Sequence, residues 1–257
     1  MAKQHKRSVP AIPRTGTVAA REYYSTASSI GRFFNWLMHL AGFADHVRKT
    51  AASALAGVAD SEEEKRQYEE SLKKPGVIDE LKRHRQLLLE VVLVRHVEAF
   101  LNYLANLMFE IFTQRPETLR SADKVEVSRI LQHATIKEVV HELARRKVDG
   151  LAYSSFSDLV AFFDERFGLY VVTAEELDTV REAIETRNIS VHNRCIINER
   201  FIARTGAAAE RLGTVRELYI DEVEKLVHTL GKSVRTLDQR ARRKLKIRGT
   251  RFGRDKT

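Results

Sequence analysis

Residues 87–112 form the most apolar stretch of this chain and read LLLEVVLVRHVEAFLNYLANLMFEIF. If this stretch is helical, its apolar side chains cover almost the whole circumference and leave only a narrow polar face. Such a helix is typical of the centre of a bundle, so we expect a central helix over about 77–113. Alternating strand patterns are nearly absent elsewhere, and the chain is therefore predicted to be an all-α helical bundle.

Four polar side chains occur at steps of four along this stretch: Glu98, Asn102, Asn106 and Glu110. Residues four apart lie on the same face of a helix. One interpretation is a narrow face in contact with solvent. In the other, Glu98, with or without Asn102, points toward the polar motif around Arg187, where it pairs with the arginine or sets the tautomer of a nearby imidazole.

Capping residues, glycines and prolines mark further helices on both sides of the central one. A Thr214-x-x-Glu217 pattern predicts a capping box that opens a last amphipathic helix. The other expected helices span about 17–57, Ser61 to Pro75, 123–132, 135–147, 155–167, 174–192 and 198–210.

The net charge of +9 is concentrated at the two ends of the chain. Residues 240–257 hold nine Lys or Arg against one acid, and residues 1–20 hold four against none, which leaves −3 for the middle. We therefore predict basic disordered tails at 1–16 and 233–257, an N-terminal helical extension at 17–74 and a main helical domain at 75–232.

The basic ends indicate a polyanionic partner, with RNA as the first expectation and an anionic membrane as the second. Contacts to RNA phosphates would be sensitive to salt and largely blind to sequence. A solubilising end without a partner is the alternative. The RNA-binding candidates are Arg240, Arg242, Arg243, Lys244, Lys246 and Arg248.

A single cysteine, Cys195, excludes an intramolecular disulfide and a cysteine-rich zinc site. The nine histidines show no spacing typical of metal ligands, so we predict neither a metal nor a cofactor. The simplest location is a reducing cytoplasm. No apolar run approaches the roughly twenty residues of a membrane span. Residues 28–48 are apolar enough to pack on the domain or on a second protomer, or to lie on a membrane surface.

A polar motif, Arg187-Asn188-Ile189-Ser190-Val191-His192-Asn193, ends the helix expected at 174–192. Thr173 and Glu176 form a capping box at its start. The apolar stripe of this helix runs through Leu177, Val180 and Ile184, and its next steps fall on 187 and 191. Because arginine is rarely buried without a partner, we expect Arg187 to have either a pairing partner or a functional role.

The motif combines groups suited to phosphate chemistry. The Arg187 fork of donors matches phosphate oxygens, and His192 can transfer a proton near neutral pH. Asn188 shares a face with His192 and can bind the phosphate or orient the ring, while Ser190 and Asn193 are further polar candidates. Arg187 and His192 lie about 140° apart around a helix, so they converge only if the helix ends nearby or a second copy contributes.

The pattern Arg-Asn-x-x-x-His resembles the signature of the HEPN superfamily of small α-helical domains, many of them metal-independent ribonucleases. Residues 185–193 followed by 196–201 resemble the RiboL-PSP-type branch, and residues 97–101 resemble its earlier helix with a Glu before an aromatic. The resemblance covers roughly residues 76–232. Arg194-Cys195 departs from it, because small residues, often Gly, are expected there.

The resemblance implies an endoribonuclease that uses the 2′-hydroxyl of its RNA substrate, with Arg187, Asn188 and His192 as catalytic residues. It also implies a homodimer with two motifs across a two-fold cleft, acting in a toxin–antitoxin pair, phage defence or RNA processing, with an antitoxin or defence protein as a further partner. Three alternatives remain: Arg187 pairs with a buried carboxylate and His192 merely caps a helix end, the HEPN domain is inactive, or the chain is a helical adaptor for nucleic acid or protein.

Overall fold

The computed structural model describes residues 12–119, 130, 132–152 and 154–252. The predicted all-α fold is confirmed, with one two-residue strand pair, β1 (Thr15–Gly16) and β2 (Thr250–Arg251). Most of the helix expected at 123–132 and the outermost basic residues lie outside the described residues. The helices are α1 (Val18–Gly57), α2 (Glu62–Lys73), α3 (Val77–Arg83), α4 (Arg85–Gln114), α6 (Ile136–Ala152), α7 (Phe156–Phe167), α8 (Ala174–Asn193), α9 (Glu199–Thr205) and α10 (Ile220–Leu245), with 3₁₀ turns at Pro116–Leu119 and Ala209–Arg211.

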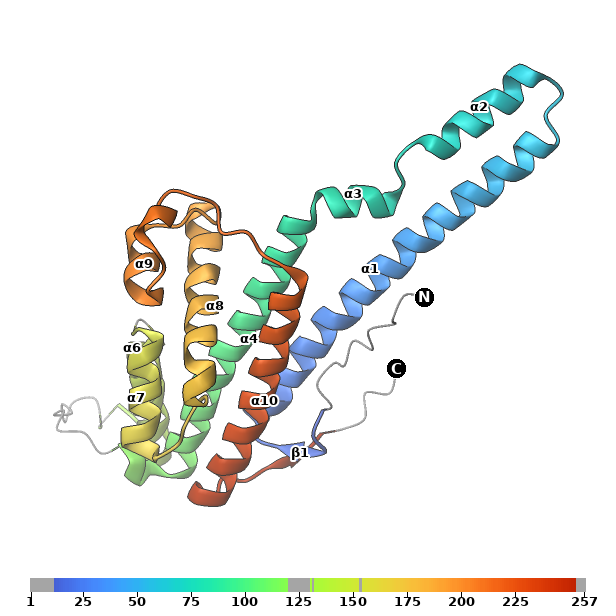
Figure 1. Cartoon of the computed structure of the whole chain (residues 1–257). Coiled ribbons are helices and arrows are strands. Elements are labelled where there is room, and N and C mark those ends of the chain that lie inside the picture. Colours follow the sequence, from blue (N-terminus) through green and yellow to red (C-terminus); the bar gives the residue numbers. More distant parts are fainter. Residues whose placement is uncertain (1–11, 120–129, 131, 153, 253–257) are drawn as a thin grey trace.

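Helix α4 occupies the centre of the bundle, as its sequence predicts. It lies between α8 on one side and α1 and α10 on the other (Figure 1). Phe100, Leu104, Ile111 and Phe112 are completely buried along it. The expected helix over 77–113 is divided in two, because the chain changes direction at His84 between α3 and α4.

The first and last described segments of the chain meet beside the core. Thr17 caps α1 and donates from its hydroxyl to Asp238 of α10 at 2.5 Å. Glu110 of α4 accepts the backbone N–H of Ala19 at 2.6 Å. Free N–H groups at a helix start favour nearby carboxylates, so these two acids fix where α1 begins.

The prediction of disordered tails is wrong where the structure describes them. Thr15–Gly16 pairs with β2, and Val234, Leu237, Ala241 and Ile247 are buried in the main core. The cations of this region alternate with an apolar stripe at helical spacing, so they form the outer face of an amphipathic helix. Counting charge alone concealed the stripe, and the main domain therefore does not end at residue 232.

The expected extension at 17–74 is partly in the core and partly outside it. Tyr23 and Tyr24 belong to the same buried cluster as Phe100, so residue 75 does not mark a domain boundary. Further along, α1 and α2 form a helical hairpin that projects from the body (Figure 1). Asp45 of α1 accepts the backbone N–H groups of Val77 and Ile78 at 2.7 and 3.1 Å, which holds the hairpin to α3.

The hairpin presents an apolar stripe to solvent. The stripe follows alternating steps of three and four residues, the spacing of a coiled-coil seam. No described helix is long and apolar enough to cross a membrane. The stripe consists of Phe33, Trp36, Leu40, Phe43 and Val47, all about half exposed or more.

The capping box expected at Thr214-x-x-Glu217 is absent. Residues 214–219 are not helical, and α10 begins only at Ile220. Arg216 donates its backbone N–H to the Cys195 carbonyl at 2.8 Å, and Leu218 donates to the side chain of Gln86 at 3.0 Å. Because this backbone pairs with the loop after α8 and with α4, it does not turn into a helix.

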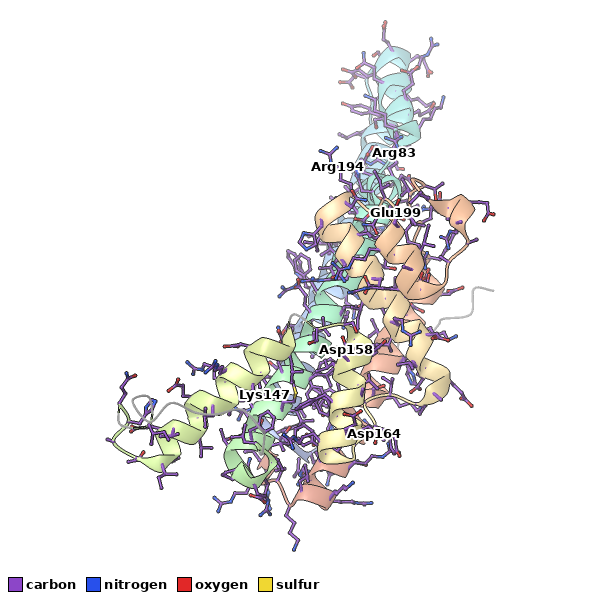
Figure 2. All side chains as sticks on the ribbon, turned by 90° about the vertical axis from the view of Figure 1, so that its left-hand side faces the viewer. Arg83, Lys147, Asp158, Asp164, Arg194 and Glu199 are labelled. Atoms are coloured by element: carbon purple, nitrogen blue, oxygen red, sulfur yellow. The ribbon has the colours of Figure 1, made fainter. Side chains whose placement is uncertain are left out.

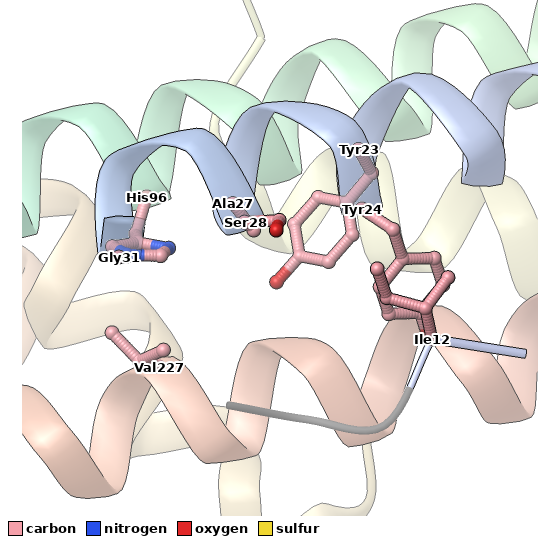
Figure 3. Close-up of a pocket in the computed structure, with 8 residues that line it drawn as sticks. All are labelled: Ile12, Tyr23, Tyr24, Ala27, Ser28, Gly31, His96 and Val227. Atoms are coloured by element: carbon pink, nitrogen blue, oxygen red, sulfur yellow. The ribbon is translucent and has the colours of Figure 1, made fainter. Parts of the chain in front are cut away.

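A cavity of about 60 Å³ lies where α1 leaves the body (Figure 3). Tyr23, Tyr24, Gly31, His96 and Val227 line it, together with Ile12, Ala27 and Ser28. His96 is buried, and its Nδ1 has no hydrogen-bond partner among the described residues. Burial lowers the pKa of His96 to about 4, so the ring is neutral at neutral pH.

Candidate functional site

Helix α8 carries the motif and ends directly after it. The backbone N–H of Thr173 donates to Glu176 at the start, as expected of the capping box. The last helical residue is Asn193, one position after His192. The helix therefore ends next to His192. A nearby helix end is one of the two conditions under which side chains about 140° apart on a helix can converge.

The two residues after α8 adopt the backbone conformation that favours glycine. Arg194 and Cys195 have φ angles of 52° and 58°. Each costs about 1 kcal/mol in this left-handed region. The Cys195 N–H donates to the Ile189 carbonyl at 3.1 Å, and its side chain is buried. The loop thus has the geometry for which glycine was expected, although this chain builds it with larger residues.

Arg187 is held by a carboxylate from the central helix. Its Nη2 donates to Glu98 Oε1 at 3.0 Å, the contact that the second interpretation of Glu98 predicts. The other oxygen of Glu98 accepts from Arg95 at 3.0 Å. The Arg187 side chain is 24% exposed, so its guanidinium combines a fixed partner with access to solvent.

The apolar stripe of α8 turns away from its expected course near the motif. Val191, expected on the buried side, is 49% exposed. Ile189 is buried instead and packs with Ile197 and Phe201 in a small second cluster. The last turns of α8 therefore pack against the following loop and α9 rather than against the main core.

A chain of polar contacts extends from Arg187 to α9. The Asn188 side chain accepts from Arg187 Nη1 at 3.2 Å and donates to Glu185 at 3.3 Å. Glu185 is buried and accepts from Arg204 at 2.7 Å. The network links α4, α8 and α9 and fixes the position of the Arg187 guanidinium.

His192 stands apart from this network. Its ring is exposed and makes no hydrogen bond to any residue within the described ranges. The expectations that Asn188 orients the ring or that Glu98 sets its tautomer are therefore wrong, because both side chains are occupied by other partners. Asn102 is also exposed and contributes no described contact to the motif.

The other polar candidates stabilise the local fold. Ser190 donates to Glu90 of α4 at 3.1 Å. Asn193 donates to the Ile196 carbonyl at 2.7 Å and closes the loop after α8. Burial raises the pKa of the Cys195 thiol, which favours a packing role for this side chain.

The basic candidates lie at the opposite end of the bundle. Figure 2 shows Arg194 and Glu199 near one end and Asp164 near the other, and α10 ends beside the loop that follows Asp164. Lys244 donates to the Gly168 carbonyl at 2.8 Å, and Arg242 donates to Thr15 at 3.3 Å. All members of the group except Arg242 are exposed: Arg240, Arg243, Lys244, Lys246 and Arg248.

Sequence reasoning missed two carboxylates of the site. Glu185 immediately follows Ile184 of the apolar stripe. This position near the buried face of the helix could have indicated a buried carboxylate. Glu90 lies two steps of four before Glu98 on α4, so extending the ladder backward would have found it. Both acids hold groups of the motif rather than facing solvent.

No family model, curated protein or solved structure matches this chain. The function must therefore be argued from the side chains themselves. The described site offers a fixed guanidinium, an exposed imidazole at a helix end and an amide beside the guanidinium. This set can bind a phosphate and transfer a proton, the two operations that phosphodiester cleavage requires.

Proposed function

We propose that this chain is a metal-independent endoribonuclease of the HEPN type. The observation that carries the proposal is the pairing of Arg187 with Glu98 in the same motif that presents His192 to solvent. The resemblance of the Arg-Asn-x-x-x-His pattern to HEPN ribonucleases supports it. So does the predicted all-α bundle, in which the motif helix packs on a central helix.

In the proposed reaction, the substrate's 2′-oxygen attacks the adjacent phosphorus while His192 accepts the 2′-hydroxyl proton. The bond from phosphorus to the 5′-oxygen breaks, and that oxygen takes a proton from a second imidazole or from water. The products are a 2′,3′-cyclic phosphate and a 5′-hydroxyl end. Arg187 stabilises the negative charge that accumulates on the phosphate oxygens, and Asn188 keeps the guanidinium in place.

We further propose that two copies of the chain form the working site. Arg187 and His192 make no direct contact in one chain and leave α8 in directions about 140° apart. In a two-fold arrangement, the arginine of one copy acts with the histidine of the other, as the resemblance implies. An antitoxin or a defence protein would then be a natural regulator of this cleft.

The test is cleavage of a mixed single-stranded RNA in excess chelator. Wild type, His192→Ala and His228→Ala are compared, because His228 is an exposed histidine on α10 away from the motif. We expect cyclic-phosphate products from wild type and His228→Ala, and a rate at least about 100-fold lower for His192→Ala. Thermal unfolding followed by circular dichroism verifies that all three are folded. Full activity of His192→Ala, or cleavage that chelator abolishes, overturns the proposal.

The exposed stripe on α1 favours a second candidate, a non-catalytic adaptor that binds a protein or nucleic acid. Contiguous exposed apolar surfaces commonly mark interaction sites. An adaptor would ignore His192→Ala and lose its partner when Trp36 and Phe43 become serine. Deleting residues 240–257 is not a suitable test, because Ala241 and Ile247 belong to the core.

A further inference from the structure

A second polar surface lies at the end of the bundle away from the motif. A groove of about 530 Å³ is lined by the loop between α7 and α8 and by the end of α10. The loop contributes Gly168, Leu169 and Tyr170, and α10 contributes Arg240, Arg243 and Lys244. The groove thus joins three cations to one aromatic ring.

Two of these cations have no partner in the described part of the chain. Arg240 and Arg243 are exposed, and neither forms an ion pair or a hydrogen bond with a described side chain. Residues 240–252 contain seven Lys or Arg and no acid. Unpaired arginines on a surface without acids are suited to bind phosphate oxygens.

The third cation holds the groove in shape. Lys244 donates to the Gly168 carbonyl, and its ammonium occupies the space that a Cβ at residue 168 would need. Gly168 also has a φ of +59°, a conformation that favours glycine. The loop is therefore fixed against α10, and Tyr170 follows two residues later.

Tyr170 supplies a surface for a base. Its side chain is 60% exposed, although the neighbouring Leu169 and Val171 are buried. No other aromatic ring of the described residues packs against it. An exposed ring beside unpaired arginines is the combination by which proteins bind single-stranded nucleic acid.

The position of the groove along α8 sets the length of a ligand that reaches both surfaces. Helix α8 begins at Ala174, four residues after Tyr170, and Arg187 lies thirteen residues further. At 1.5 Å per residue, this distance is about 20 Å. A strand with bases stacked at about 3.4 Å spans it with about six nucleotides.

We propose that this groove binds single-stranded RNA, with one unpaired base stacked on Tyr170 and the flanking phosphates on Arg240 and Arg243. The inference rests on the proposed function, which supplies RNA as the substrate class. It assigns substrate selection to a surface about six nucleotides from the cleaved bond. The enzyme should then prefer unpaired RNA long enough to reach both the groove and the motif.

The experiment measures RNA binding separately from cleavage. All proteins carry His192→Ala so that the RNA remains intact, and fluorescence anisotropy follows a labelled twelve-nucleotide oligouridine (a length of about twice the six-nucleotide span). Tyr170→Ala should weaken binding about 5- to 150-fold, whereas Tyr170→Phe keeps the ring and should stay within about twofold. A duplex of the same length should bind equally well to both proteins, because its bases are not free to stack.

The arginines are tested by the salt dependence of binding. Arg240→Ala with Arg243→Ala should reduce the slope of log affinity against log salt by about 1.4, since each phosphate contact on a single strand contributes about 0.7. Lys49→Ala with Lys73→Ala removes the same charge from α1 and α2 and serves as the matched control. Both side chains are exposed on the hairpin that projects from the body (Figure 1).

The outcomes separate this inference from the proposed function. If Tyr170→Ala and the arginine pair bind RNA as well as their controls do, the groove proposal is wrong, whether or not the wild type cleaves. If they lose RNA and the wild type, assayed separately, does not cleave, the groove stands and the nuclease does not. If they lose only binding to anionic vesicles, the surface is a membrane site and the proposal fails.

Discussion

Arg187 and Arg216 both pair with glutamates beside α8, yet their surroundings differ. Arg216 is 9% exposed and contacts Glu182 at 3.1 Å, Glu222 and the carbonyl of Glu217. Arg187 is 24% exposed and has one carboxylate partner, Glu98. Two acids and a carbonyl occupy both terminal nitrogens of Arg216, which therefore fixes the 214–219 segment to α8 and α10. Arg187 is held by one partner and remains partly exposed, as expected of a group that binds a ligand.

The comparison predicts its largest effect for Arg187→Lys. Lysine keeps the charge but loses the planar fork, so we expect RNA cleavage to fall about 100- to 1000-fold with little change in unfolding free energy. Initial cleavage rates and urea unfolding measure the two quantities. Arg181→Lys, earlier on α8, is the matched control and should remain active. An active Arg187→Lys variant would show that Arg187, like Arg216, has a structural role only.

The reverse pattern is expected for Arg216→Ala. Removing this side chain leaves Glu182 and Glu222 facing each other without a cation, and we expect a loss of about 3 kcal/mol of unfolding free energy. Partial exposure of both acids keeps the loss at the lower end of the range for buried pairs. Urea unfolding measures it, and the molecules that remain folded should retain RNA cleavage. An unchanged midpoint would show that Arg216 does not hold the segment.

His96 extends the comparison to a buried group with no described partner. Its folded pKa, about 4, lies below the ordinary 6.5, so the unfolded chain binds the proton more readily and stability falls as the pH falls between these values. We expect His96 to cost about 2 kcal/mol of stability between pH 7 and pH 5. His96→Phe should remove this part of the pH dependence. At each pH, the unfolding free energy of the variant is subtracted from that of the wild type. This difference cancels the titration of groups that the two proteins share, including Glu110 and Asp238. Parallel stability curves for the two proteins would contradict the assignment.

The smallest effect on stability is expected for Glu98→Gln. This pair is partly exposed, so its loss should change the unfolding free energy by less than about 1 kcal/mol. Cleavage should nevertheless decrease, because Arg187 loses the anion that positions it. Glu80→Gln breaks a comparable exposed pair with Arg83 on α3 and should leave cleavage unchanged. Equal activities of these two variants would show that Arg187 does not need Glu98 for RNA cleavage.

Much of the architecture follows from periodicity. The central position of α4 and the start of α8 after Thr173 could be predicted from the sequence, because apolar spacing and capping residues act locally. The contact between Glu98 and Arg187 was one of two interpretations of the polar line on the central helix, since an arginine next to an apolar stripe needs an acid.

Other features depend on partners that are distant in sequence. Nothing near Arg216 indicates its two glutamates, and the Thr214-x-x-Glu217 pattern suggested a helix start because pairing with Cys195 is not visible in local sequence. The end of the chain was misjudged for a different reason. Its cations were counted together, whereas the spacing of Leu237, Ala241 and their neighbours decides burial.

The joining of the two chain ends has a consequence for synthesis. Thr17 and Asp238 are 221 residues apart, and the strand pair links Thr15 to Arg251. The start of α1 therefore has no complete docking site until α10 and β2 have been synthesised. Contacts this distant slow folding, and until they form Tyr23 and Tyr24 remain uncovered. Helix α1 is thus synthesised well before it can dock, and truncations that remove Asp238 or β2 should damage the packing of α1 as much as substitutions within it do.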